Sequence, residues 1–251
     1  FGQGFVGKLA FPSANVSDRI EKTFTSVNFN MMIMIIYALI TIAIFGMWYY
    51  ARYEGNFLPS PKKTFNPMML VAIVILVPGT QFAANFIANL TGYIRPDWLQ
   101  QYNELFETSG ITDTTFVTVL YSVILAPICE ELIFRGVTMR CARKALPFAL
   151  ANLMQAALFG LFHLNWIQGI YAFALGIVLG YVCERGGSIY YSMGLHLLFN
   201  LWGTLSGFFP DPGNSVVVFV VVIVVTIVSL VAGFVLFNKG RRKLPINSTG
   251  I

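Results

Sequence analysis

The chain has 251 residues, of which 57% are hydrophobic and only 11% are charged, and its formal net charge is +5. A soluble domain is about 45–50% apolar and about 25% charged. This composition therefore excludes a disordered chain and a globular protein whose whole surface is in contact with water. The Lys and Arg residues are scattered between apolar runs, which excludes a nucleic-acid-binding face, and three irregularly spaced cysteines exclude a disulfide framework. The sequence is that of a membrane protein.

Seven stretches approach the roughly 20 mostly apolar residues that a transmembrane helix needs. They predict an all-α, polytopic transmembrane helical bundle of about seven spans. The chain begins at Phe1 without a Met, so an eighth span is expected if a preceding segment belongs to the protein. The seventh stretch is rich in Val and Ile and predicts a plain lipid-facing helix. The predicted spans are Asn30–Tyr50, Pro67–Ile94, Thr114–Thr138, Pro147–His163, Trp166–Cys183, Ser188–Phe209 and Ser215–Asn238.

The connection Pro96–Gly110, after the second span, differs from the others. Trp98, Tyr102 and Leu105 lie there at helical spacing, with polar residues between them. This pattern is typical of a short amphipathic helix that lies in the membrane interface. We expect it to anchor the chain, and the alternative is that it acts as a gate.

Lys and Arg residues fall in alternate connections, and this pattern predicts the orientation of the chain. The connections after the second and sixth spans are instead neutral or acidic. Because cytoplasmic loops carry the excess of Lys and Arg, we expect a cytoplasmic C-terminus and an N-terminus outside. The basic residues are Arg52, Lys62, Lys63, Arg140, Arg143, Lys144, Arg185, Lys239, Arg241, Arg242 and Lys243, and the acidic ones are Asp97, Glu104, Glu107, Asp113 and Asp211.

The third span carries charged residues at a depth where plain spans have none. Glu131 and Arg135 are four residues apart, with the acid first, which favours an ion pair on one helix face. Glu130 lies about 100° away around the helix and has no partner on its own helix. Pro127 removes a backbone donor and is expected to free the carbonyl of Val123, which would bend the helix around a cavity. The alternative is that both acids only pair with Arg135 and a neighbouring helix.

Both histidines of the chain also lie in predicted spans. His163 ends the fourth span, one turn after Phe159. His196 lies in the sixth span, and Asn200 follows it by four residues, so the two side chains project from the same helix face. A lone histidine on an apolar helix is usually a core residue. Two histidines, an amide and an unpaired acid on three helices favour a functional site instead.

These residue types suit the hydrolysis of a carbonyl compound. A glutamate with a histidine partner can activate a water molecule for attack, and a histidine and an asparagine on one face can donate hydrogen bonds to the oxyanion that forms. Ser192 and Cys129 are less well placed to act as nucleophiles. Water attack assisted by an acid is therefore the simplest chemistry.

The three motifs Glu130-Glu131-x-x-x-Arg135, Phe159-x-x-x-His163 and His196-x-x-x-Asn200 resemble, in order, the signature motifs of the CPBP intramembrane protease family. That family includes the type II CAAX prenyl endopeptidase and bacterial relatives linked to bacteriocin processing or immunity. The resemblance covers residues 120–203. It implies a membrane-embedded catalytic cavity in a multi-pass protein, which we expect in a bacterial cell membrane, with lipids and a peptide or prenylated protein as partners.

The resemblance also implies a role for each motif residue. Glu130 would be the water-activating acid and base with His163 as its partner, and His196 and Asn200 would form the oxyanion hole. Glu131, Arg135 and Phe159 would support them. No cofactor and no metal are expected. The alternative is a zinc ion held by Glu130, His163 and His196, which are ordinary zinc ligands.

These motifs divide the chain into three parts. Residues 1–114 would form the N-terminal spans and the interfacial helix, residues 115–209 the catalytic helical core, and residues 210–251 the last span with a basic cytoplasmic tail. We expect the cavity to open toward the cytoplasm. His163 would lie about 24 Å along its helix, whereas Glu130 and His196 would lie about 12–15 Å from their cytoplasmic ends, so the helices must tilt or break if the three are to meet.

Two other functions remain alternatives. The first is a non-catalytic immunity or scaffold protein of the same fold. The second is a proton-coupled transporter in which Glu130 and the histidines relay protons. A transporter should show inverted repeats with broken helices, and the sequence shows no such symmetry. The sequence therefore favours an intramembrane endopeptidase that cleaves a prenylated C-terminal, leader or transmembrane substrate.

Overall fold

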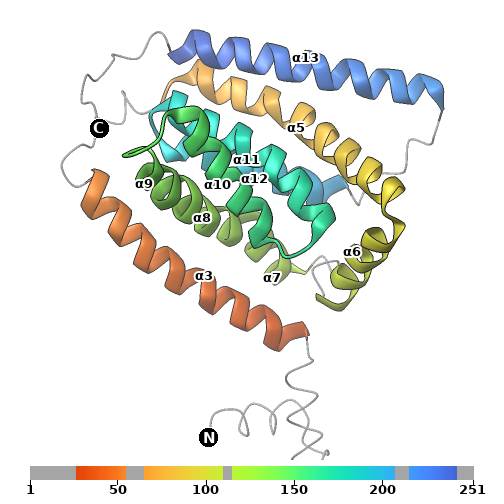
Figure 1. Ribbon diagram of the computed structural model, residues 1–251, viewed down its shortest axis with the longest axis horizontal. Helices are drawn as coiled ribbons and strands as arrows, with labels where there is room; N and C mark the ends of the chain where they lie inside the picture. The colour runs from red at the N-terminus through yellow and green to blue at the C-terminus, as the bar shows by residue number, and fades with distance from the viewer. Residues whose placement is uncertain (1–26, 55–64, 110–114, 207–214, 242–251) are drawn as a thin grey trace, which may run out of the picture.

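The computed structural model describes residues 27–54, 65–109, 115–206 and 215–241, and every regular element within these ranges is a helix (Figure 1). The all-α prediction is confirmed for them. The elements are α3 (Val27–Tyr49), η1 (Tyr50–Glu54), α5 (Pro67–Ile94), α6 (Pro96–Ser109), α7 (Phe116–Val119), η2 (Leu120–Leu125), α8 (Ala126–Glu131), η3 (Leu132–Met139), α9 (Arg140–Ala142), α10 (Phe148–Phe162), α11 (Trp166–Gly186), α12 (Ile189–Ser206) and α13 (Val216–Arg241).

Five helices of the described residues are long and apolar enough to cross a membrane, which makes the chain an integral multi-pass membrane protein. Helix α10 is apolar but has only 15 residues, about 22 Å of helix against a hydrocarbon core of about 30 Å. Helix α12 is not among the five either. The count of seven complete spans is therefore not confirmed. The five are Phe29–Arg52, Pro67–Ile94, Phe116–Ala142, Trp166–Gly186 and Val216–Arg241.

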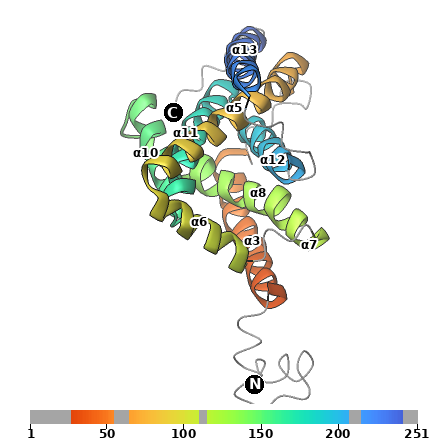
Figure 2. The same cartoon turned by 90° about the vertical axis from the view of Figure 1, so that its right-hand side faces the viewer.

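Helices α5 and α13 pack closely, on the side of the bundle opposite α3 (Figures 1 and 2). Pro78 interrupts the hydrogen bonding of α5, and the hydroxyl of Ser229 on α13 inserts at that point. It accepts the N–H of Gly79 at 2.8 Å and donates to the carbonyl of Ile75. Helix α13 is thus not purely lipid-facing, because the buried hydroxyl of Ser229 bonds to the backbone groups of α5 that Pro78 leaves without partners.

The long helix that carries the acidic motif runs through α7, η2, α8, η3 and α9 between α3 and α12 (Figure 2). Segments η2 and η3 are π-helical, so the helix is wider there than an α-helix. π-helical turns are frequent at functional sites. Helix α11, which contributes none of the three motifs, packs against α5, α10 and α12 through buried residues such as Leu179 and Val182.

Candidate active site

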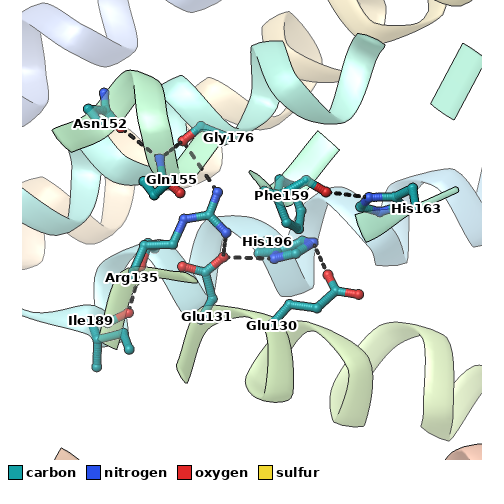
Figure 3. Close-up of polar contacts among 11 residues, drawn as sticks. Glu130, Glu131, Arg135, Asn152, Gln155, Phe159, His163, Gly176, Ile189 and His196 are labelled. Carbon is teal, nitrogen blue, oxygen red and sulfur yellow. Dashed lines mark hydrogen bonds and ion pairs between the residues drawn. The ribbon is translucent and has the colours of Figure 1, made fainter. Parts of the chain in front are cut away.

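The predicted ion pair of the third span is present and wholly buried. Nη1 of Arg135 donates to Oε1 of Glu131 at 2.9 Å, and neither side chain is exposed to solvent (Figure 3). Nη2 of Arg135 also donates to the carbonyl of Gly176 on α11 at 3.3 Å, and its guanidinium lies 4.4 Å from the ring centre of Phe159. The arginine is therefore fixed by three helices.

His196 lies between the two adjacent carboxylates (Figure 3). Its Nδ1 is 2.9 Å from Oε1 of Glu131, and its Nε2 is 3.6 Å from Oε2 of Glu130. Because the carboxylate of Glu131 accepts, Nδ1 carries a proton. The geometry thus gives Glu130 a histidine partner on a different helix.

Phe159 separates the two histidines. Its ring makes edge-to-face contacts with His163, at a centroid distance of 4.9 Å, and with His196, at 5.7 Å. Nδ1 of His163 lies 2.8 Å from the carbonyl of Phe159 and donates to it, so Nε2 is left as the acceptor nitrogen. His163 directly follows α10 and lines the same cavity as Glu130. The two residues are therefore brought to one site despite their predicted difference in depth.

Asn200 is bound to the helix of the acidic motif. Its Nδ2 donates to the backbone carbonyl of Ser122 at 2.8 Å. That carbonyl receives no bond from Ala126, whose N–H bonds to Tyr121 in the π-helical segment, and Pro127 has no N–H to offer. The freed carbonyl was expected at Val123, one residue later. The π-helical geometry shifts the hydrogen-bond pattern by one residue, which leaves the carbonyl of Ser122 open to Asn200.

Two buried amides of α10 were not singled out from the sequence. Nε2 of Gln155 donates to the carbonyl of Gly176 at 2.9 Å, the same oxygen that Arg135 contacts, and to Oδ1 of Asn152 at 2.7 Å. Nδ2 of Asn152 donates to the carbonyl of Ile177 at 3.0 Å. The sequence signal was their spacing of three residues inside an apolar helix. The pair fixes α10, and with it Phe159 and His163, against α11.

A cavity of about 760 Å³ lies beside these residues. All four residues expected to be catalytic line it, whereas Glu131 and Arg135 do not. Its wall is formed by α3, α5, α6, the long helix (α7, η2 and α8), α10, α11 and α12. Amides and hydroxyls lie among its apolar lining groups. Besides the catalytic set, the polar lining residues are Gln81, Asn85, Tyr102, Thr118, Tyr121, Ser122, Gln168, Tyr171, Thr204 and Ser206.

Among the described residues, no group of three His, Cys, Asp or Glu side chains is placed to hold one metal ion. Ser192 donates its hydroxyl proton to the carbonyl of Ile189 at 2.9 Å. Cys129 is buried, and neither it nor Ser192 lines the cavity.

The family comparison matches the part of the chain that holds this site. Residues 112–202, roughly a third of the chain, match the family model described as type II CAAX prenyl endopeptidase Rce1-like. No curated protein and no solved structure matches the chain significantly. The matched segment contains all three motifs and every residue of the buried cluster around His196. The core of this chain, residues 112–202, is thus similar to the Rce1-like family of CAAX membrane proteases.

Proposed function

We propose that the protein is an intramembrane endopeptidase in which Glu130 activates a water molecule for attack on a peptide carbonyl of a membrane-associated substrate. The observation that carries the proposal is the position of His196, which lies between Glu131 and Glu130 and lines the cavity. A buried histidine in this position can hold and move a proton next to a carboxylate that faces water. General acid and base catalysis requires such a pair.

Glu130 accepts a proton from water while the water oxygen bonds to the carbonyl carbon, and the carbonyl oxygen becomes an oxyanion. The second N–H of the Asn200 amide and a protonated Nε2 of His196 supply hydrogen bonds to that oxyanion. The C–N bond then breaks, and the leaving amine takes the proton held by Glu130. The Nε2 of His163 faces the cavity as an acceptor and orients the water molecule.

The ion pair of Glu131 with Arg135 has a supporting role in this proposal. The Glu131 carboxylate fixes the ring of His196 through Nδ1, as a carboxylate fixes the tautomer of a catalytic histidine in other hydrolases. Arg135 neutralises that carboxylate within the bundle. Metal-free hydrolysis is the mechanism that this donor set supports best.

The proposal is tested with purified protein in lipid nanodiscs and a set of internally quenched peptides, which includes unmodified peptides and a farnesylated C-terminal peptide. The Glu130→Gln variant should lose about 10²- to 10⁴-fold in cleavage rate while it remains folded. Glu104→Gln is the matched control, because Glu104 is exposed on α6, bonds to Gln100 and does not line the cavity. Cleavage by Glu130→Gln at the wild-type rate would contradict the mechanism.

A wild-type protein that cleaves no peptide of the set would contradict the endopeptidase function itself. The non-catalytic alternative would then be favoured if the Glu130→Gln chain still performed its role in the cell.

A further inference from the structure

A second hollow, which shares no lining residue with the cavity beside Glu130, lies on the outer surface of the bundle. It has a volume of about 470 Å³ and lies between α10, α11 and α13, with α11 in contact with both of the others (Figure 2). Leu153 and Ile177 line it and are 48% and 37% exposed, so it is a groove open to the surroundings of the bundle. We call it the outer groove. Its volume is within the about 300–1,000 Å³ of small-molecule sites.

The outer groove offers an occupant apolar surface only. Among its lining residues, Asn152 and Tyr181 alone have polar side-chain groups, and both are already bonded within the bundle. The amide of Asn152 donates to the carbonyl of Ile177 at 3.0 Å and accepts from Gln155 at 2.7 Å. The hydroxyl of Tyr181 donates to Oδ1 of Asn238 on α13 at 2.9 Å. A peptide would leave its N–H and C=O groups without partners here, at a cost in free energy, whereas a hydrocarbon chain has no such groups.

Basic side chains lie at one end of the outer groove. Arg185 follows Tyr181 by one helical turn, and its guanidinium carbon is 5.7 Å from the ring centre of that tyrosine, so the charge lies against a lining residue. Lys144 precedes Phe148, the first residue of α10, by four positions. Lys239 directly follows the residue of α13 that bonds to Tyr181. Helix α10 begins and helices α11 and α13 end on this side, the left of Figure 1, which we call the basic end of the bundle.

The charge at this end of the groove is not neutralised by the protein. Arg185, Lys144 and Lys239 are all exposed, and none of them forms an ion pair with another described residue. The neighbouring acid Glu184 pairs with Arg143 at 3.1 Å. An apolar groove that ends at unpaired cations is complementary to a ligand with a hydrocarbon chain and an anionic head.

We propose that the outer groove binds an anionic phospholipid. The first part of an acyl chain lies on α11 between α10 and α13, and the phosphate lies among Arg185, Lys144 and Lys239. Basic pockets between membrane helices are typical sites for anionic headgroups. A second copy of the chain fits less well, because in the same membrane orientation it would bring its own cations to the same end. The site is separate from the proposed catalytic cavity and does not depend on the endopeptidase function.

Competition between two lipids tests the headgroup. The purified full chain is incubated in detergent with equal amounts of phosphatidylglycerol and phosphatidylcholine that carry the same acyl chains. Native mass spectrometry then measures the lipid that each protein molecule retains. Because the acyl chains are identical, a preference reports on the headgroup alone. We expect phosphatidylglycerol to be retained at least about tenfold more than phosphatidylcholine.

A matched pair of charge variants tests the position of the headgroup. Arg185→Gln removes one exposed cation at the groove, and the retention of phosphatidylglycerol should fall about fivefold, as expected for one cation near an anionic lipid. Arg52→Gln is the control, since Arg52 is exposed and follows α3, on the side of the bundle opposite α13 (Figure 1). Equal retention of the two lipids by the wild-type chain, or equal losses in the two variants, would overturn the proposal.

Photochemical labelling tests the position of the acyl chain. Phosphatidylglycerol with a diazirine on its acyl chain is activated by light, and the labelled peptides are identified by mass spectrometry. Label should concentrate in Phe148–Leu153, in Ile177–Tyr181 and around Phe234, and should be several-fold lower in Val216–Val221, an apolar part of α13 outside the groove. Even labelling of these segments would overturn the proposal. So would native spectra that show a dimer without bound phosphatidylglycerol, because a second copy would then occupy the groove.

Discussion

The imidazole of His196 is bound to the carboxylate of Glu131 through a 2.9 Å hydrogen bond between Nδ1 and Oε1, although the two residues are 65 positions apart. The contact turns the other ring nitrogen, Nε2, toward Glu130. A single carboxylate therefore determines both the orientation of the ring and the nitrogen that faces the cavity.

Substitution of Glu131 by Gln tests this relationship. The amide oxygen can still accept from Nδ1, but the negative charge that fixes the ring is lost. We expect the cleavage rate at saturating substrate to fall about 10- to 100-fold with little change in KM. Glu184→Gln is the control, since Glu184 pairs with Arg143 at the basic end of the bundle and does not line the cavity. Equal losses in both variants would contradict a specific role for Glu131.

The buried ion pair should also govern stability. Arg135→Met leaves the carboxylate of Glu131 without its cation in a fully buried site, so we expect a loss of about 3–5 kcal/mol in the free energy of unfolding. Adding Glu131→Met should recover most of that loss, because no charge is then left unpaired. Denaturation in detergent measures both. A double variant less stable than Arg135→Met alone would contradict this explanation.

The helix pattern of the sequence predicts much of this fold. Helix α5 was predicted with the observed bounds, because Pro67 and the polar residues after Ile94 mark its ends. The long helix was predicted over Thr114–Thr138 and runs over Phe116–Ala142. The count of seven complete spans is not confirmed, because α10 is largely apolar but has only 15 residues. Apolarity alone does not reveal where a helix ends inside a membrane.

The site was predictable where it depends on one helix and not where it depends on two. The pairing of Glu131 with Arg135 follows from a spacing of four residues. The contact of His196 with both carboxylates depends on the relative rotation of α8 and α12, which no spacing within a helix encodes. The bond from Asn200 to Ser122 depends on a π-helical segment, and sequence periodicity does not distinguish that segment from an α-helix.

Asn200 should stabilise the π-helical segment as well as serve the reaction. Asn200→Ala removes the donor to the carbonyl of Ser122, and we expect a cost of about 1–3 kcal/mol in the free energy of unfolding. Pro127→Ala returns an N–H to this part of the helix, so the same substitution should cost less in that background. A double-mutant cycle by denaturation measures the difference. Equal costs in the two backgrounds would mean that the Ser122 bond does not stabilise the segment.

Helices α10 and α11 approach each other closely at two glycines. A Cβ at Gly160 would lie 2.5 Å from the backbone carbonyl oxygen of Gly169, which cannot move aside as a side chain can. We expect Gly160→Ala to lower the free energy of unfolding by about 1–3 kcal/mol and to displace His163. Gly194→Ala is the control, since a Cβ there has no neighbour within 4 Å and should stabilise α12 by about 0.5–1 kcal/mol. Melting temperatures in detergent that fall equally in both variants would contradict the steric explanation.

The carbonyl oxygen of Gly176 accepts from both Arg135 and Gln155, so the acidic motif and the histidine-bearing helix are aligned against a main-chain atom. No side-chain substitution can delete a main-chain atom. Helix α11 can therefore exchange most of its lipid-facing side chains without loss of this alignment. The exceptions are positions where a larger residue would push the partners away, above all Gly180, where a Cβ would lie 1.9 Å from Oδ1 of Asn152. A mutational scan of α11 should find tolerance along the helix, interrupted at its small residues.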